Sequence, residues 1–310
     1  MKGLPRIIKR KPKHENKRTF YLHFTVTIFM GSTKSPIIDI HAHAFDSFEG
    51  WDFIPKTFLS KRGNFITPKS IEELTNTVLS HFKNYNVKAV TFGPSTKKWK
   101  KQAPDNIIQA IPLEVMNPLP SIESLREAHQ NNELNLLGEI TLQYRGLAPN
   151  DPILDPYYDL ANELDVPILI HVGLSAPNIT YSGWGSRYRS QLTNPFLLED
   201  VLNKYPDIRI CVAHAGWPML ESMLHMLYTY PNLYADISTL NWVLTEKEFY
   251  HYFGRIIDAG FHEQILYGSD LMIWPNAITI SIERTAKAPF LSENQKRDIF
   301  YNNAKRFLRI

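Results

Sequence analysis

The residues best suited to metal chemistry lie in or just after short apolar runs of this 310-residue chain. His41 and His43 are separated by one residue at the end of such a run, and two imidazoles with that spacing can converge on one cation. The same placement recurs at four further positions, Glu139, His171, His214 and Asp270. Burying an ionisable group is costly unless it is paired or bound to a metal. The pattern therefore predicts a metal site.

The spacing of residues 38–43 also predicts which way their side chains point. Side chains alternate between the two faces of a strand, so Asp39, His41 and His43 should share one face. Ile38 and Ile40 should then lie on the other face, toward surrounding helices. Asp236 ends another apolar run, and we interpret it as a structural hydrogen-bond acceptor.

Eight short apolar runs alternate with stretches of helical period, which is typical of βαβ units around a parallel sheet. The predicted strands are residues 37–41, 88–92, 107–111, 136–142, 167–171, 208–214, 233–237 and 264–269. The predicted helices are residues 68–85, 121–133, 155–165, 196–205, 218–230, 246–259 and 293–308, the last opened by a capping box at Ser292 and Gln295. We predict one α/β domain over residues 36–310, a (β/α)8 TIM barrel with the metal site at the C-terminal ends of its strands.

Two predicted loops, residues 51–68 and 173–194, are long for a barrel and should lie on the catalytic face. Arginine can hold a carboxylate with two hydrogen bonds, so an acidic or aromatic small molecule is the expected substrate. The candidate substrate residues in or near such loops are Arg145, Trp184, Arg187, Tyr188, Trp217 and Trp274. For each arginine, an exposed loop position is an equally good interpretation.

Composition narrows the class of protein further. The formal net charge is +3, and its basic excess lies within the first 18 residues, so no nucleic-acid-binding face is predicted. The single cysteine, Cys211, excludes an intramolecular disulfide and a multi-cysteine zinc site. It lies in an apolar run, which indicates a buried and unreactive thiol.

Residues 1–35 are predicted to form a basic N-terminal extension that is either disordered or a weak targeting segment. The apolar stretch at residues 20–30 is too short to span a bilayer and lacks the cleavage site of a good signal peptide. We expect a cytoplasmic protein, with export as the alternative if this stretch acts in targeting. A start at Met30 in place of Met1 is also left open.

Five strings of residues resemble the amidohydrolase superfamily, in particular the amidohydrolase-related branch that includes aminocarboxymuconate-semialdehyde decarboxylase and several lactone and ester hydrolases. The strings are Ile-Asp-Ile-His-Ala-His ending at His43, Gly-Glu-Ile around Glu139, Ile-His-Val-Gly around His171, Ala-His-Ala-Gly-Trp-Pro around His214 and Tyr-Gly-Ser-Asp ending at Asp270. They follow the order of family strands one, four, five, six and eight.

The resemblance implies that His41, His43, His171 and Asp270 bind a divalent metal, with Zn²⁺ expected. His214 would polarise a water or bind a second metal. Glu139 stands where many members of the superfamily carry a bridging ligand, so the metal count, one or two, stays open. Asp270 would accept a proton from the attacking water and deliver it to the leaving group.

The function expected from these residues is hydrolysis of a small carbonyl compound, that is, a lactone, an ester or an amide. A non-oxidative decarboxylase on the same scaffold is the alternative, and an inactive ligand-binding barrel is a third hypothesis. The sequence leaves the substrate and the oligomeric state open, a homodimer included.

Overall fold

Nine short parallel strands carry the fold in the computed structural model, which describes residues 35–51, 54, 65–114 and 117–310. The strands are β1 (Ile37–His43), β2 (Val87–Phe92), β3 (Ile107–Gln109), β4 (Ile111–Leu113), β5 (Leu137–Ile140), β6 (Ile168–His171), β7 (Ile210–Ala213), β8 (Leu233–Asp236) and β9 (Ile265–Leu266). Only Ala110 separates β3 from β4, so these two strands take the place of the single strand predicted over residues 107–111.

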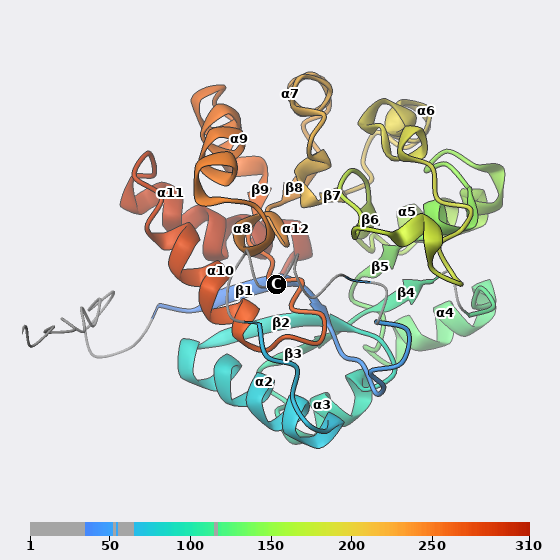
Figure 1. The fold of residues 1–310 in the computed structure, drawn as a ribbon. Helices are drawn as coiled ribbons and strands as arrows, with labels where there is room; N and C mark the ends of the chain where they lie inside the picture. Colours follow the sequence, from blue (N-terminus) through green and yellow to red (C-terminus); the bar gives the residue numbers. More distant parts are fainter. Residues whose placement is uncertain (1–34, 52–53, 55–64, 115–116) are drawn as a thin grey trace, which may run out of the picture. The chain divides into compact units, whose positions relative to one another are not determined.

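Helices alternate with the strands and surround them (Figure 1). They are α2 (Ile71–Tyr85), α3 (Thr96–Gln102), α4 (Ile122–Gln130), α5 (Asp155–Glu163), α6 (Glu199–Lys204), α7 (Leu220–Thr229), α8 (Leu240–Val243), α9 (Glu246–Asp258), α10 (Asn276–Ala286), α11 (Glu293–Arg297) and α12 (Asn303–Leu308). Ser70 begins α2 by accepting a hydrogen bond from the backbone of Glu73, and the predicted capping box of Ser292 and Gln295 begins α11.

Hydrogen bonds connect the strands into the predicted TIM barrel. The strands pair in the order β1-β2-β3 and β4-β5-β6-β7-β8-β9, all parallel. Between the two groups, the amides of Ala110 and Ile111 donate to neighbours on opposite sides, Thr91 and Leu136. At the remaining seam, the amide of Ile40 donates to Tyr267 (3.0 Å) and the amide of Asp270 donates to His41 (2.7 Å). The fold class is therefore an α/β TIM barrel.

Two apolar clusters show which strand residues face inward and which face the helices. The larger cluster contains Ile168, Ile170, Ile210 and Val212 together with residues of the helices. The smaller cluster contains the residues that alternate with them, and they pack against the C-terminal helix α12. Its members include Ile38, Ile40, Leu169, Cys211, Leu266 and Phe307. The smaller cluster is the interior of the barrel, and the buried thiol of Cys211 belongs to it, as predicted.

The prediction that Ile38 and Ile40 face the helices was therefore wrong. The reason is a bulge in β1, where the three steps from Asp39 to Ala42 match only two steps along β2. The extra residue lets Ile40 and His41 both face inward, which a regular strand forbids. The Asp39 carboxylate accepts hydrogen bonds from the amides of His41 (3.1 Å) and Ser269 (2.9 Å), so it supports the bulge rather than the site.

Three further differences from the sequence-based prediction concern helices. α3, α8 and α10 were not predicted, because α3 and α8 are short and the buried face of α10 includes the polar residues Ser281 and Thr285. The helix predicted over residues 293–308 is interrupted by a π-helical turn at Asp298–Asn302, which separates α11 from α12. The predicted loop at residues 173–194 contains two short 3-10 turns, at Ile179–Tyr181 and Ser190–Thr193.

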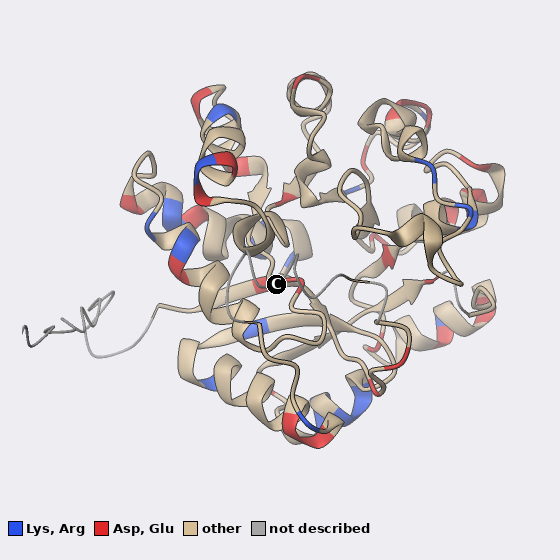
Figure 2. Ribbon diagram, in the orientation of Figure 1, with Lys and Arg blue, Asp and Glu red and all other residues tan. Residues whose placement is uncertain are grey.

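The N-terminal extension and the apolar stretch at residues 20–30 lie outside the described residues, as does most of the loop at 51–68. Within the part of the chain that the structure describes, no helix is both long and apolar enough to cross a bilayer. Residues Ser35–Ile310 form one compact unit. Lys, Arg, Asp and Glu lie mainly on its outer helices and loops, with both signs interspersed (Figure 2).

Candidate metal centre

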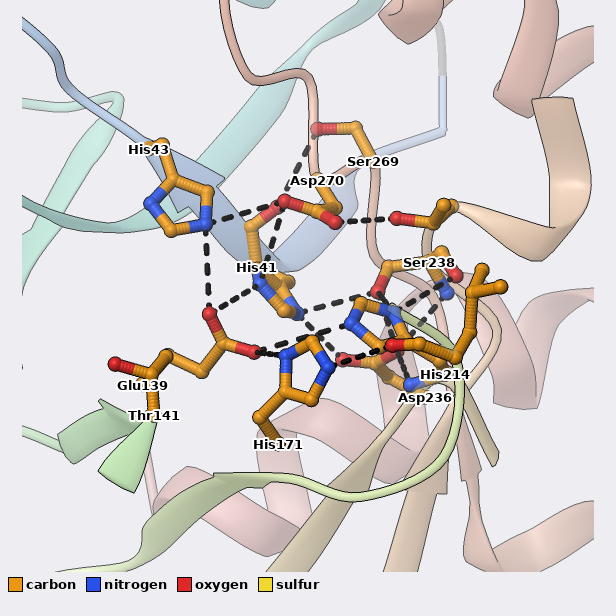
Figure 3. A network of polar contacts seen from close by, with 12 residues as sticks. His41, His43, Glu139, Thr141, His171, His214, Asp236, Ser238, Ser269 and Asp270 are labelled. Atoms are coloured by element: carbon orange, nitrogen blue, oxygen red, sulfur yellow. Dashed lines mark hydrogen bonds and ion pairs between the residues drawn. The ribbon is translucent and has the colours of Figure 1, made fainter. Parts of the chain in front are cut away.

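The six predicted metal-site residues lie together at the C-terminal ends of the strands, and all are buried (Figure 3). His41 and His43 lie on β1, Glu139 on β5 and His171 at the end of β6. His214 comes directly after β7, and Asp270 follows β9 by a few residues. Parallel strands in a barrel bring their C-terminal ends to one rim, which explains how residues separated by more than 200 positions meet.

A second bulge turns Glu139 toward this centre. Between Leu137 and Ile140, β5 has one residue more than the matching segment of β6. Gly138 and Glu139 are the residues of this bulge, and the φ of Gly138 is 142°. A Cβ atom there would lie 2.3 Å from the carbonyl oxygen of Leu169, so only glycine fits. The Gly-Glu pair is therefore a structural unit in which the glycine allows the glutamate to point inward.

Four side-chain atoms from three strand ends converge on one point. His41 Nε2 lies 3.5 Å from both Glu139 Oε2 and Asp270 Oδ1, and His43 Nε2 lies 3.5 Å and 3.2 Å from the same two oxygens. Both Nε2 atoms and Asp270 Oδ1 are buried and have no hydrogen-bond partner among the described residues. Ligands about 2.1 Å from a tetrahedral cation lie about 3.4 Å apart, so this set fits a metal ion.

The outer ring nitrogens of two histidines are held by their neighbours. His41 Nδ1 donates to Asp236 Oδ2 (2.9 Å), and His214 Nδ1 donates to the carbonyl oxygen of Ser238 (3.2 Å). Asp236 also accepts hydrogen bonds from the backbone amides of His214 and Ser238, both at 2.9 Å. These contacts place the proton of each ring on Nδ1 and leave Nε2 able to bind a cation. Asp236 is the structural acceptor that the sequence predicted.

His171 lies on a different side of Glu139 from His41 and His43. Its Nε2 is 2.6 Å from the carbonyl oxygen of Leu174, which can only accept, so Nε2 carries a proton. Its Nδ1 lies 2.7 Å from Glu139 Oε1, another acceptor. His214 Nε2 lies 3.8 Å from the same oxygen. A second proton on His171, or a cation next to Glu139 Oε1, would satisfy this arrangement. His171 thus contacts Glu139 Oε1, whereas His41 and His43 lie next to Glu139 Oε2.

Two residues that the sequence analysis missed contact the centre. Thr239 Oγ1 donates a short hydrogen bond to Asp270 Oδ2, the carboxylate oxygen that faces away from the two histidines. The hydroxyl of Tyr144 lies 3.4 Å from His171 Nε2 and accepts a hydrogen bond from Ser175 (3.1 Å). Neither residue ends an apolar run, so position in the sequence gave no signal for them.

The pKa values of the site describe an excess of buried negative charge. Burial works against a charged imidazole, but the carboxylates of Asp270 and Glu139 outweigh it and raise the pKa of His43 to about 9. The pKa of His41 is raised for the same reason. Burial opposes ionisation of Glu139 and Asp270, yet the neighbouring histidines lower the pKa of both carboxyls. By contrast, burial and the nearby His171 lower the pKa of His214 to about 4.

A cavity of about 310 Å³ opens beside these residues. Five tryptophans line it together with aliphatic side chains, and three of the predicted substrate residues, Trp184, Trp217 and Trp274, are among them. Trp51, Trp242 and Tyr144 line it as well. His171, His214 and Asp270 are its ionisable residues apart from Tyr144, within the described part of the chain. The cavity thus joins the candidate metal centre to an apolar wall that is rich in aromatic side chains.

The other three predicted substrate residues lie elsewhere. Arg145 donates to the backbone carbonyls of Glu114 (2.9 Å) and Asn117, outside the cavity lining. Arg187 is exposed and does not line the cavity. Tyr188 is buried behind the wall, where its ring packs against Tyr144 at 5.5 Å between centroids. Neither arginine is placed to hold a substrate carboxylate in this structure.

A parallel α/β barrel with buried histidines and carboxylates at the C-terminal ends of its strands defines a class of barrel enzymes that use divalent cations. The sequence profile described as Amidohydrolase matches residues 38–310. The chain therefore belongs to the amidohydrolase family, which is metal-dependent. None of the curated proteins compared with the sequence matches it.

Solved structures share the fold at low sequence identity. An uncharacterized TIM-barrel protein, Bb4693 of Bordetella bronchiseptica, is 17% identical with a TM-score of 0.67, over 89% of this chain and 99% of that one. A complex of 2,6-dihydroxybenzoate decarboxylase is 15% identical with a TM-score of 0.60, over 89% and 100%. A probable 2-pyrone-4,6-dicarboxylic acid hydrolase from Acinetobacter baumannii is 15% identical with a TM-score of 0.59, over 89% and 100%. At these identities the likeness concerns the fold alone.

Proposed function

We propose that this protein is a metal-dependent hydrolase of small carbonyl compounds, that is, of a lactone, an ester or an amide. The observation that carries the proposal is the convergence of His41 Nε2, His43 Nε2, Glu139 Oε2 and Asp270 Oδ1 at 3.2–3.5 Å. Three of these atoms are buried without a hydrogen-bond partner among the described residues. Such atoms are destabilising unless a cation or protons compensate them.

The donor set favours Zn²⁺. Two imidazole nitrogens with carboxylate oxygens suit zinc, whereas calcium and magnesium prefer oxygen ligands. Asp236 supports the assignment because a carboxylate hydrogen-bonded to the outer nitrogen of a histidine is common around metal sites. His171 would join through a second ion, held with His214 and Glu139 Oε1, and the close approach of these three groups supports that site.

When bound, a divalent cation supplies a water molecule activated near neutral pH and a positive charge for a developing oxyanion. The residues of this chain would accept the proton and orient the reacting groups. Asp270 is ionised, because its pKa is lowered, and it lines the cavity, so it can accept a proton from an attacking water. His214 keeps its ring proton on Nδ1 through the hydrogen bond to Ser238, so its Nε2 can hold a cation or accept a hydrogen bond from the attacking water. Thr239 fixes the orientation of the Asp270 carboxylate.

Non-oxidative decarboxylation is the alternative, and the mainly apolar cavity is the observation that favours it. Removing a carboxylate from water destabilises it relative to the neutral carbon dioxide that it releases. One structural neighbour is a decarboxylase by name and another is a probable hydrolase. The two reactions differ in the fate of water, because only hydrolysis incorporates oxygen from solvent into the product.

The test combines metal content with product analysis. The full chain is loaded with zinc, its metal is counted by mass spectrometry, and it is incubated with aromatic esters, lactones and carboxylic acids in ¹⁸O-labelled water. Hydrolysis predicts zinc in the protein and one ¹⁸O atom in each acid product. Release of carbon dioxide without label in the organic product would replace hydrolysis by decarboxylation. A chain that binds no zinc and converts nothing would support the inactive ligand-binding barrel.

A matched pair of variants shows whether the zinc that is counted lies at the candidate metal centre. His171→Ala removes a buried histidine next to Glu139, and His225→Ala removes an exposed histidine of α7. We expect His171→Ala to lose the second equivalent of zinc, if two are bound, while His225→Ala keeps the wild-type content. Equal loss in both variants would indicate adventitious binding.

A further inference from the structure

Three tryptophans around the cavity donate their indole N–H groups to other protein residues. Trp242 Nε1 donates to the carbonyl oxygen of Ser269 (2.7 Å), Trp274 Nε1 donates to Thr67 (3.2 Å), and Trp217 Nε1 donates to Glu248 (3.1 Å). With these N–H groups engaged, the three indoles offer the cavity carbon surface only. An aromatic guest gains from such surface by burial and by ring contacts.

The aromatic rings hold one another in place, which keeps this surface formed without a ligand. Trp274 contacts Trp242 and Trp51 with ring centroids 5.9 Å and 5.8 Å apart, both close to edge-on. Tyr144 and Trp184 form another edge-on pair at 5.1 Å. Packed rings of this kind lose little conformational entropy when a ligand binds, so they favour flat and rigid guests.

No lysine or arginine lines the cavity within the described residues. The ionisable side chains that do line it, apart from Tyr144, are His171, His214 and Asp270, all part of the candidate metal centre. A carboxylate far from this centre would therefore lose its hydration next to indole rings without gaining a cationic partner among the described residues. Burial of an ion without a partner is strongly unfavourable.

We propose that the substrate is a compact aromatic or similarly flat apolar compound that carries no ionised group besides the one that faces the metal centre. The inference rests on the site of the proposed function, but it holds for hydrolysis and for decarboxylation alike. It predicts weak binding of dicarboxylic compounds, and it replaces the arginine-bound carboxylate expected from Arg145 and Arg187.

Binding of three simple anions to the zinc-loaded full chain tests the proposal without any turnover. Five of the six tryptophans line the cavity, so quenching of intrinsic fluorescence reports occupancy directly. We expect benzoate to bind at least about ten-fold more tightly than acetate, which lacks the ring, and at least about ten-fold more tightly than isophthalate, which adds a second carboxylate. Isophthalate binding as tightly as benzoate, or acetate matching benzoate, would overturn the proposal.

Added cations inside the cavity should reverse the selection against a second charge. Met272 and Ala176 line the cavity and are only partly buried, so a lysine at either position can be accommodated. In Met272→Lys or Ala176→Lys, we expect the preference for benzoate over isophthalate to fall by about ten-fold. Tyr228→Lys adds the same charge at a side chain that is 82% exposed and should leave the preference unchanged. An unchanged preference in both cavity variants, with zinc content and thermal unfolding like wild type, would contradict the proposal.

Failure of the inference and failure of the proposed function give different results. If the anions show the expected order but no ester, lactone or acid is converted, the substrate class stands and the enzymatic function fails. If the chain hydrolyses esters but prefers substrates without a ring or with two carboxylates, the enzymatic function stands and the substrate class fails.

Discussion

The two ends of the barrel differ in what they bury. At the C-terminal ends of the strands, histidines and carboxylates are buried around Glu139 and Asp270. At the other end, α12 covers an apolar interior with Phe307 and Leu308. Arg209 fixes this helix by donating to the carbonyl oxygen of Phe307 and to Asp165 (2.8 Å). The closed end therefore stabilises the folded state, whereas the open end holds charges that oppose folding until a cation or protons compensate them.

The largest expected effect comes from removing a ligand at the open end. His43→Ala takes away one of the four converging atoms, so metal and activity should be lost together, with activity reduced by about 1,000-fold or more. The unfolding temperature of the metal-free chain should fall, because Glu139 and Asp270 lose the protonated imidazole that compensates their charge. Zinc content, kcat and thermal unfolding measure the three effects. Full activity in His43→Ala would contradict the ligand assignment.

At the closed end, the expected effect falls on stability instead. Phe307 is fully buried in the barrel interior, and Phe307→Ala should lower the free energy of unfolding by about 3–5 kcal/mol. Denaturant unfolding of the metal-free chain measures this change. The protein that stays folded should keep its zinc affinity and kcat. A loss of zinc affinity beyond the change in folded fraction would show that the two ends of the barrel are coupled.

Asp236 provides a test of how strongly metal binding depends on hydrogen bonds to the outer nitrogens of the histidines. Asp236→Asn keeps the size of the side chain but removes the charge next to His41 Nδ1. Outer hydrogen bonds of this type are worth about 10–100-fold in metal affinity, and we expect a loss in that range. Competition with a zinc chelator gives the affinity. As a matched control, Asp298→Asn changes a carboxylate near His262, away from the centre, and should have no effect on zinc binding.

A smaller effect on activity is expected at Thr239, which tests whether its hydroxyl supports Asp270. Thr239→Val removes the hydroxyl that donates to Asp270 Oδ2 and keeps the shape of the side chain. We expect kcat to fall by about ten-fold, the value of one hydrogen bond to a charged group, with little change in KM. Thr239→Ser restores the donor and should recover most of kcat. If serine and valine behave alike, Thr239 acts through packing rather than through its hydroxyl.

The smallest expected effect is a release of protons when metal binds. The pKa of His43 is raised to about 9 in the metal-free protein, so at neutral pH this imidazole carries a proton that must leave before Nε2 can bind a cation. Zinc affinity should therefore increase with pH until about pH 9. Calorimetry in two buffers of different ionisation enthalpy counts the protons released. Binding without proton release at neutral pH would contradict the charged state of His43.

Much of the barrel could be predicted from the sequence because strands and helices leave periodic apolar patterns. The strand with His41 and His43 and the runs before His171 and His214 were located within a few residues. The bulge after Asp39 could not be predicted, since an extra residue in a strand leaves no mark on the apolar period. Thr239 and Tyr144 were missed for a related reason: their roles depend on which strand ends lie next to them, and hydroxyl groups are common in loops.

The fold class, the family and the ionisable residues that meet at the C-terminal ends of the strands could be predicted from the sequence, because they depend on local periodicity and on ionisable residues placed in apolar runs. The positions and contacts of these residues could be read only from the tertiary structure. It placed Glu139 between two pairs of histidines, assigned Asp39 to a bulge and Asp236 to the support of His41, and moved both candidate arginines out of the cavity. The physical reason is that the orientation of a side chain depends on contacts with distant strands and on local changes of register.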